Sequence, residues 1–344
     1  MSDQSLLAEL TVLATRELEL CAVDETQTVL IVSTVDTHAL MGAALLAASQ
    51  SLGAECVEAV LPAVGVASVG GVPRRTSVPK SLIKWCADAD LLVDVTARGM
   101  LHSSTQAELL ATGTRILRAR EPVDCLARLF PTPEVRASVE RSGQILGDGD
   151  KVRITSEHGT DVTLVTGDRP ISLQYGYSAD RGRWDHWGTA LVVTAPLENS
   201  AVGDLVLSPG DVIFLSATIG RYVAEPVTLH LAGGAIASVE GGAEKALIEE
   251  LLIHKDDEQA RHTSHVGWGC DPRADWYALE RYAGKGGGGA DVRSASGGVV
   301  LAFGANTDLG GVNSTSRHVD LALRGLSVEV AGVRPVVAGS LNLE

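Results

Sequence analysis

Two histidines and one aspartate stand out in this sequence, because together they could bind one metal ion. His318 and Asp320 are separated by a single residue in the segment NSTSRHVDLAL. Residues two apart on a strand project from the same face, so this pair can offer an imidazole and a carboxylate to one ion. His265 lies in HTSHVGWGCDP, where two glycines permit close approach of the backbone. Two histidines and one carboxylate are the ligands of mononuclear Fe(II) sites that keep positions free for dioxygen and substrate.

Each of these segments also has a simpler interpretation. A His-x-Asp pair occurs often by chance, and it can lie on the solvent-facing edge of a sheet. His265 can be a structural histidine beside a turn. The 53 residues between His265 and His318 decide nothing, because the ligands of one site often come from different elements.

The densest group of aromatic and ionisable side chains is the segment QYGYSADRGRWDHW, residues 174–187. Only 4% of the chain is aromatic, yet two tyrosines and two tryptophans fall in this segment. Such a cluster can stack against a planar aromatic substrate. His186 lies within it and can act as a general base or a proton shuttle near neutral pH. The alternative is a packed loop between domains.

The elements around these residues predict two domains. In residues 1–150, strand patterns at 28–33, 55–62, 91–96 and 114–119 alternate with helical patterns, which predicts an α/β domain with a parallel sheet. Ligands usually bind beyond the C-terminal ends of such strands, and residues 98–102 follow one of them. A helical stretch at 134–144 then leads into residues 151–344, where we expect a β-rich α+β domain.

Within the second domain, a β-hairpin is predicted over 151–167, one helix over 244–261 and another within 271–283. The run Gly286–Gly289 is expected to be a flexible loop with no helix directly after it. It lacks the Lys-Ser/Thr of a phosphate-binding loop.

Composition excludes several classes of protein. The chain has 344 residues and a net charge of −15, which disfavours binding to nucleic acid and to anionic membranes. The polar N-terminus does not have the pattern of a signal peptide, so we expect a cytoplasmic protein. The five cysteines form no CxxC pair, which argues against a disulfide framework and a structural zinc site.

Several motifs together resemble those of the 2,5-dihydroxypyridine 5,6-dioxygenases of bacterial nicotinate and nicotine degradation. The similar segments are collinear and span nearly the whole chain: VDETQTVLIV (23–32), MLHS (100–103), GTRILRAREPVDCLARLFPT (113–132), YGYSADRGRWDHW (175–187), VEGG (239–242), SHVGWGCDPRADW (264–276) and HVDLALR (318–324). Two positions depart from the expected pattern. Gln174 stands where an acidic residue is expected, and Cys270 where an aliphatic residue is expected.

The resemblance implies an aminopeptidase T-like fold and one Fe(II) held by residues His265, His318 and Asp320. It implies that a small hydroxylated pyridine is opened with dioxygen between C5 and C6, giving N-formylmaleamate. The residues assigned to catalysis are His102 and His186, as base and proton shuttle in either order. The residues assigned to the substrate are Gln174, Tyr175 and Arg183. We also expect a homo-oligomer. The alternatives are a two-metal aminopeptidase of the parent fold and a non-catalytic member that binds ring compounds.

Overall fold

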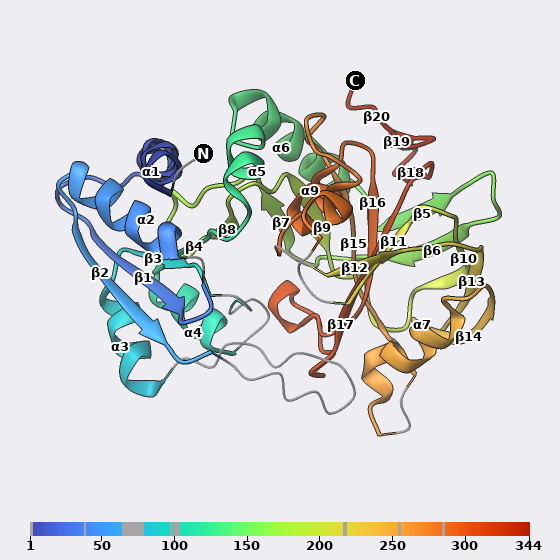
Figure 1. Ribbon diagram of the computed structural model, residues 1–344. Coiled ribbons are helices and arrows are strands. Elements are labelled where there is room, and N and C mark those ends of the chain that lie inside the picture. Colours follow the sequence, from blue (N-terminus) through green and yellow to red (C-terminus); the bar gives the residue numbers. More distant parts are fainter. Residues whose placement is uncertain are drawn as a thin grey trace. The chain divides into compact units, whose positions relative to one another are not determined.

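The computed structural model describes residues 3–37, 39–63, 79–96, 99, 104–215, 219–253, 256–283 and 286–344. They form two compact units, shown in Figure 1. The first unit contains the described parts of 1–67 and 73–131 together with 175–189; the second contains 132–174 and 190–344. The sequence suggested a single boundary at residue 150, and the structure differs in two segments. The helix at 133–147 packs in the second unit, and residues 175–189 return to the first because they add a strand to its sheet.

The first unit contains a parallel sheet in the order β2-β1-β3-β4-β8. Its elements are α1 (Asp3–Leu20), β1 (Thr28–Thr34), α2 (Ala39–Ser51), β2 (Glu55–Leu61), α3 (Lys80–Asp88), β3 (Leu91–Asp94), α4 (Ser104–Thr112), β4 (Arg115–Arg118), α5 (Val123–Arg128) and β8 (Trp184–His186). Strands β3 and β4 are buried along their whole length. This burial explains why their sequences are short runs without polar-apolar alternation.

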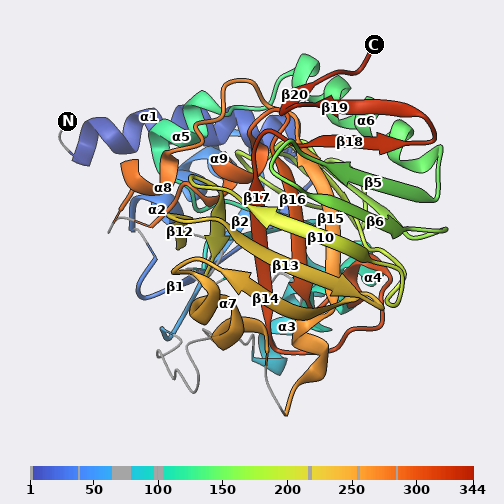
Figure 2. The ribbon, with the colours of Figure 1, turned by 90° about the vertical axis from the view of Figure 1, so that its right-hand side faces the viewer.

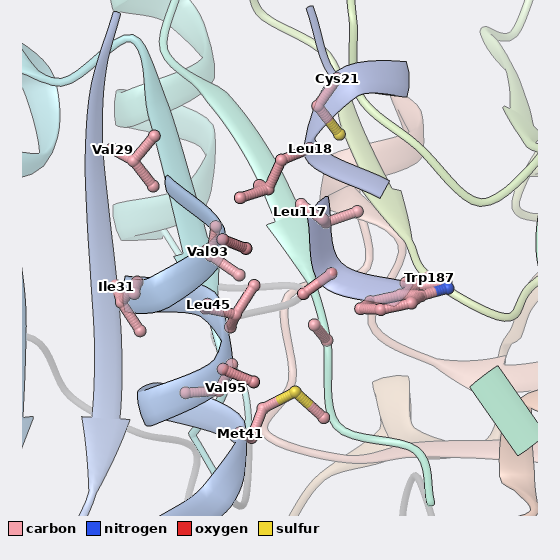
Figure 3. Close-up of a cluster of buried hydrophobic side chains, with 14 of the residues drawn as sticks. Leu18, Cys21, Val29, Ile31, Met41, Leu45, Val93, Val95, Leu117 and Trp187 are labelled. Carbon is pink, nitrogen blue, oxygen red and sulfur yellow. The ribbon is translucent and has the colours of Figure 1, made fainter. Parts of the chain in front are cut away.

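Helices cover both faces of this sheet, and neighbouring residues of β1 point into different cores. Val29 and Ile31 pack with residues of α1, α2 and α5, whereas Leu30 and Val32 pack with residues of α3 and α4. Figure 3 shows the first of these cores, in which Trp187 packs with side chains of α1, α2 and the strands. Because side chains alternate along a strand, successive residues of β1 face opposite cores.

The second unit contains a largely antiparallel sheet in the order β14-β13-β10-β6-β5-β18-β19-β20, seen side by side in Figure 2. Its strands are β5 (Lys151–Thr155), β6 (Asp161–Val165), β10 (Val202–Leu207), β13 (Val227–Ala232), β14 (Ala235–Gly241), β18 (Ser327–Val330), β19 (Val333–Val337) and β20 (Ser340–Leu341). Strands β5 and β6 form the predicted hairpin. Buried and accessible residues alternate along β5, as expected for a sheet with one covered face.

A second sheet of this unit has the order β12-β11-β17-β16-β15-β9-β7 and carries the candidate metal ligands. Its strands are β7 (Ile171–Gln174), β9 (Leu191–Thr194), β11 (Val212–Phe214), β12 (Gly220–Tyr222), β15 (Thr263–Gly269), β16 (Val299–Gly304) and β17 (His318–Leu323). The central strands β15 and β16 are buried throughout. Their position explains the continuous apolar run at 299–304.

Short helices complete the second unit: α6 (Pro133–Gly147), α7 (Lys245–Leu252), η1 (Glu258–Arg261), α8 (Ala278–Arg281), α9 (Gly289–Ser294) and η2 (Thr307–Leu309). Helix α6 begins at a favourable cap, because the Thr132 hydroxyl accepts a hydrogen bond from Val135 N and Pro133 occupies the first turn. Two predictions were wrong. The helix expected over 244–261 ends at Leu252 and resumes only as the 3₁₀ turn η1. The glycine run 286–289 was expected to open no helix, but α9 begins at its last residue, Gly289.

The predicted fold class, a parallel α/β part joined to a β-rich α+β part, is confirmed. The sequence patterns missed α1 and the short strand β8, whose residues we had assigned to an aromatic cluster. No helix among the described residues is long and apolar enough to cross a membrane.

Candidate metal centre

The three predicted ligands come together on one face of the seven-stranded sheet. His265 lies on β15, and His318 and Asp320 lie on β17. Between these strands runs β16, whose residues opposite Asp320 and His318 are Ala302 and Gly304. Because both are small, no bulky side chain of the middle strand separates the ligands. The register of the sheet therefore gathers residues that lie 53 positions apart in the sequence.

The donor atoms of these side chains converge on one carboxylate oxygen. His265 Nε2 lies 3.2 Å from Asp320 Oδ1, and His318 Nε2 lies 3.0 Å from the same atom. The two imidazole rings are 5.1 Å apart between centroids. One donor atom from each residue lies within 4.8 Å of the others. In the described part of the chain, no other group of three or more histidine, cysteine or acidic side chains gathers in this way.

Hydrogen bonds fix the orientation of His318. Its Nδ1 lies 3.0 Å from the carbonyl oxygen of Ala305, which also accepts a hydrogen bond from the Ser264 hydroxyl. A carbonyl oxygen can only accept, so His318 Nδ1 carries the proton. Its Nε2 is then the ring nitrogen that faces Asp320 Oδ1, 3.0 Å away. A backbone carbonyl that selects the tautomer in this way is a common partner of metal-binding histidines.

Charges around the site favour the forms that bind metals. Burial opposes ionisation of Asp320, but the Arg293 guanidinium, His318 and hydrogen bonds from both imidazoles outweigh it and hold the pKa of Asp320 well below its usual value. Burial lowers the pKa of His265, although the nearby Asp320 acts in the opposite direction. A neutral imidazole and an ionised carboxylate are the protonation states that a metal ion requires.

This donor set fits a single divalent cation. The Nε2 atoms of His265 and His318 lie 3.2 and 3.0 Å from one oxygen of Asp320, so the three donor atoms are close enough to share one cation. Two imidazole nitrogens and one carboxylate oxygen suit non-haem Fe(II). Dinuclear hydrolytic sites hold two metal ions about 3.5–4 Å apart, and a three-residue ligand set is small for that purpose. The side chains therefore suit one metal ion better than two.

The aromatic segment at 175–187 belongs to the first unit, where its side chains pack against one another. The Tyr175 ring is buried, with the Arg183 guanidinium 3.8 Å from its centroid and the Tyr177 ring 4.9 Å away. Asp185 is buried and accepts hydrogen bonds from the backbone N–H groups of Tyr175, Gly176 and His186, and from Arg183. This carboxylate therefore holds the segment in shape. Roles for Tyr175 and Arg183 in substrate binding remain predictions.

The structure describes only one of the two predicted catalytic histidines. His186, on β8, is mostly buried, and its Nε2 lies 3.9 Å from the buried carboxyl of Glu121. His102 lies outside the described residues. Gln174 ends β7 in the second unit, where it pairs with Leu191 and is half-buried. Cys270, the other position that departs from the expected family pattern, is a buried thiol near the Ser142 hydroxyl.

Comparison with known proteins identifies the family. Residues 9–343 match the model of the family described as NicX, 2,5-dihydroxypyridine 5,6-dioxygenase. A curated 2,5-dihydroxypyridine 5,6-dioxygenase from Pseudomonas putida is 32% identical over 97% of this chain and 96% of its own length. The chain belongs to this dioxygenase family.

Solved structures agree with this membership of the 2,5-dihydroxypyridine 5,6-dioxygenase family. The dioxygenase from Pseudomonas putida KT2440 superposes with a TM-score of 0.91 at 31% identity, over 99% of this chain and 98% of that one. AmpT from Thermus thermophilus superposes with a TM-score of 0.63 at 14% identity, over 95% of this chain and 96% of that one. The second likeness concerns the fold alone, and it agrees with the aminopeptidase T-like fold predicted from the sequence.

One residue in contact with the candidate metal ligands of this dioxygenase was missed by the sequence analysis. Arg293 Nε donates a hydrogen bond of 2.5 Å to Asp320 Oδ2. The residue lies on α9, the helix that the sequence analysis did not predict after the glycine run. Arg293 lies four residues after Gly289, but a single arginine near a glycine run is not a recognisable motif. Nothing in the sequence therefore marked this residue.

Proposed function

We propose that this family member is an Fe(II)-dependent dioxygenase that opens the ring of 2,5-dihydroxypyridine between C5 and C6. The observation that carries the proposal is the convergence of His265 Nε2 and His318 Nε2 on Asp320 Oδ1. It is supported by the identity to a relative named for this reaction. The product expected is N-formylmaleamate, in which C5 has become a carboxylate carbon and C6 a formyl carbon.

The chain's residues have separate tasks in this proposal. His265, His318 and Asp320 would hold the iron, which when bound would bring dioxygen and the ring together and allow electrons to pass from the ring to dioxygen. Either His186 or His102 accepts the proton of the 5-hydroxyl group, because the oxyanion is more electron-rich than the neutral ring. The other histidine moves a proton during ring opening. A well-placed acid or base contributes roughly 10²–10⁴-fold to a rate.

Residues near the aromatic segment are assigned to substrate recognition. The proposal gives contacts with the ring to Gln174, Tyr175 and Arg183. Gln174 can both donate and accept a hydrogen bond, and this allows it to pair with a ring carbonyl or a ring nitrogen. A homo-oligomer remains our expectation for the assembly, and light scattering on the purified protein would test it.

The reaction can be tested with purified protein and isotopically labelled oxygen. The chain is purified without oxygen, supplied with Fe(II), and mixed with 2,5-dihydroxypyridine and ¹⁸O₂. We expect one dioxygen consumed for each ring opened and both labelled atoms in the product by mass spectrometry. The matched control is the His265→Ala variant treated in the same way. Label in only one oxygen position, or peptide hydrolysis without oxygen consumption, would contradict the proposal.

A further inference from the structure

The two oxygens of Asp320 have different partners. Oδ1 faces the Nε2 atoms of both histidines, whereas Oδ2 accepts a hydrogen bond from Arg293 Nε at 2.5 Å. The Asp320 and Arg293 side chains are both largely buried, with 8% and 16% of their surfaces exposed. A charge-assisted hydrogen bond in such surroundings is strong and directional. Oδ2 is therefore already engaged on the side of the carboxylate that faces away from the imidazoles.

A phenylalanine holds Arg293 in the position that makes this contact. Strand β11 pairs with β17 through Val212 and Ala322 and through Ile213 and Leu321, so the next residue, Phe214, comes beside Asp320. The Arg293 guanidinium lies 3.7 Å from the centroid of the Phe214 ring. Stacking of this kind keeps the planar guanidinium from turning.

The backbone and the core add to this restraint. Arg293 Nη1 donates a hydrogen bond of 3.1 Å to the carbonyl oxygen of Gly289, at the start of the same short helix. Phe214 is 1% exposed and packs in a core that contains Val292, the residue before Arg293. The guanidinium is thus fixed by a ring, a carbonyl and a carboxylate at once. Such multiple contacts on a rigid element are the usual means of holding a ligand in one orientation.

We propose that Arg293, held by Phe214, keeps Asp320 a ligand through one oxygen only, so that coordination positions stay free for substrate and dioxygen. A carboxylate can bind a metal ion through one oxygen or through both. In an octahedral site with six positions, three single-atom ligands leave three positions free, whereas a two-oxygen carboxylate leaves two. Arg293 and Phe214 are positioning residues in this account, which rests on the proposed Fe(II) function.

Bound water on Mn(II) provides a test that does not depend on turnover. Mn(II) is a stable substitute for Fe(II), and the proton relaxivity of bound Mn(II) rises with the number of exchangeable water molecules on it. The variants are Arg293→Met, which removes the donor, and Phe214→Leu, which removes the ring face. Arg293→Lys keeps the charge without the planar group. The control is Phe303→Leu, which shortens a buried phenylalanine of the neighbouring strand β16.

We expect the relaxivity per bound Mn(II) to fall by about one third in Arg293→Met, because a second carboxylate oxygen displaces one of three water molecules. Arg293→Lys and Phe214→Leu should show smaller decreases in the same direction, and Phe303→Leu should match the wild type. The inference is wrong if every variant saturated with Mn(II) keeps the wild-type relaxivity, even where the affinity is lower. Failure of the wild-type chain to bind one Mn(II) would instead contradict the proposed metal site itself.

Discussion

Two buried carboxyl groups, one in each unit, have opposite electrostatic surroundings. Asp320 in the second unit has two imidazoles and a guanidinium within hydrogen-bonding distance, and its pKa is held well below the usual value despite its burial. Glu17 in the first unit is fully buried on α1, and neither of its carboxyl oxygens has a hydrogen-bond partner among the described residues. Burial, with a smaller contribution from the nearby Asp185, raises the pKa of Glu17 well above 4.5.

Because both groups are buried, the opposite directions of their pKa shifts come from their different partners. Desolvation disfavours the ionised form of both groups. Only Asp320 has cationic and hydrogen-bonding partners that reverse this effect. A carboxylate kept ionised inside a protein is suited to receive a cation, whereas a neutral carboxylic acid is not. Of these two carboxyl groups, only Asp320 is therefore suited to bind a cation.

The largest effect should follow from removing the charge of Asp320. Asp320→Asn keeps the shape of the side chain but takes away the anionic ligand, so we expect iron content and oxygen consumption to fall to background. Elemental analysis and an oxygen electrode would measure both. The control is Asp211→Asn, another buried carboxyl group of the second unit, which caps the N–H groups of Ser208 and Arg324. If Asp320→Asn keeps one iron per chain, the charge of Asp320 is not needed for metal binding, and our interpretation of the comparison is wrong.

His186→Ala and His102→Ala should separate proton transfer from metal binding. We expect each variant to retain iron and to turn over roughly 10²-fold more slowly. His230→Ala is the control, because His230 is a histidine of the eight-stranded sheet paired with Asp204. Lost iron in either catalytic variant would mean that the ligands are assigned wrongly. Normal turnover in both variants would mean that neither histidine takes part in catalysis.

Gln174→Glu should change substrate preference while leaving the metal centre intact. A glutamate only accepts hydrogen bonds when ionised, whereas glutamine also donates. We expect the relative kcat/KM among hydroxypyridines and their carboxylated analogues to shift by about 1–3 kcal/mol, the usual contribution of a hydrogen bond to a charged group. A panel of these compounds, with iron measured in both proteins, would reveal the shift. An equal loss for all substrates would argue for packing alone.

The smallest effect concerns Glu17 and the stability of the fold. The pKa of Glu17 is higher in the folded chain than in the unfolded one, so unfolding releases a proton and stability falls as pH rises above about 4.5. Glu17→Gln cannot ionise, so its stability relative to the wild type should increase between pH 5 and pH 8, by at most about 1.4 kcal/mol for each pH unit. Urea unfolding at both pH values would measure it. Glu140→Gln, at a more accessible ion pair with Arg136, should show no such trend; an equal trend there would contradict the explanation.

Local patterns predicted most of the elements around the site but not their three-dimensional neighbours. The strand-like runs at β1, β3 and β4 and the alternation of β5 are local properties, and they predicted strands correctly. Strand β8 was missed because its three residues pair with β4, more than 60 positions away. A segment of this length has no periodicity of its own, and only the long-range pairing makes it a strand.

The sequence analysis proposed His318 and Asp320 because their His-x-Asp spacing is visible in the sequence, and the family motifs supported all three candidate ligands. His265 comes close to His318 and Asp320 because β16, the strand between β15 and β17, has small residues opposite the latter two. The contact of Arg293 with Asp320 depends on the position of α9 and on the ring of Phe214. No spacing in the sequence encodes that three-residue contact, so it required the structure.

Metal stoichiometry tests the central claim most directly. The wild-type chain would be purified without oxygen, loaded with Fe(II), freed of loosely bound metal, and analysed for iron and zinc alongside its ring-opening rate. The account predicts close to one iron per chain, with activity that rises in proportion to iron content and is absent from the metal-free protein. Two zinc ions per active chain, or full ring-opening activity without iron, would contradict a mononuclear site at His265, His318 and Asp320.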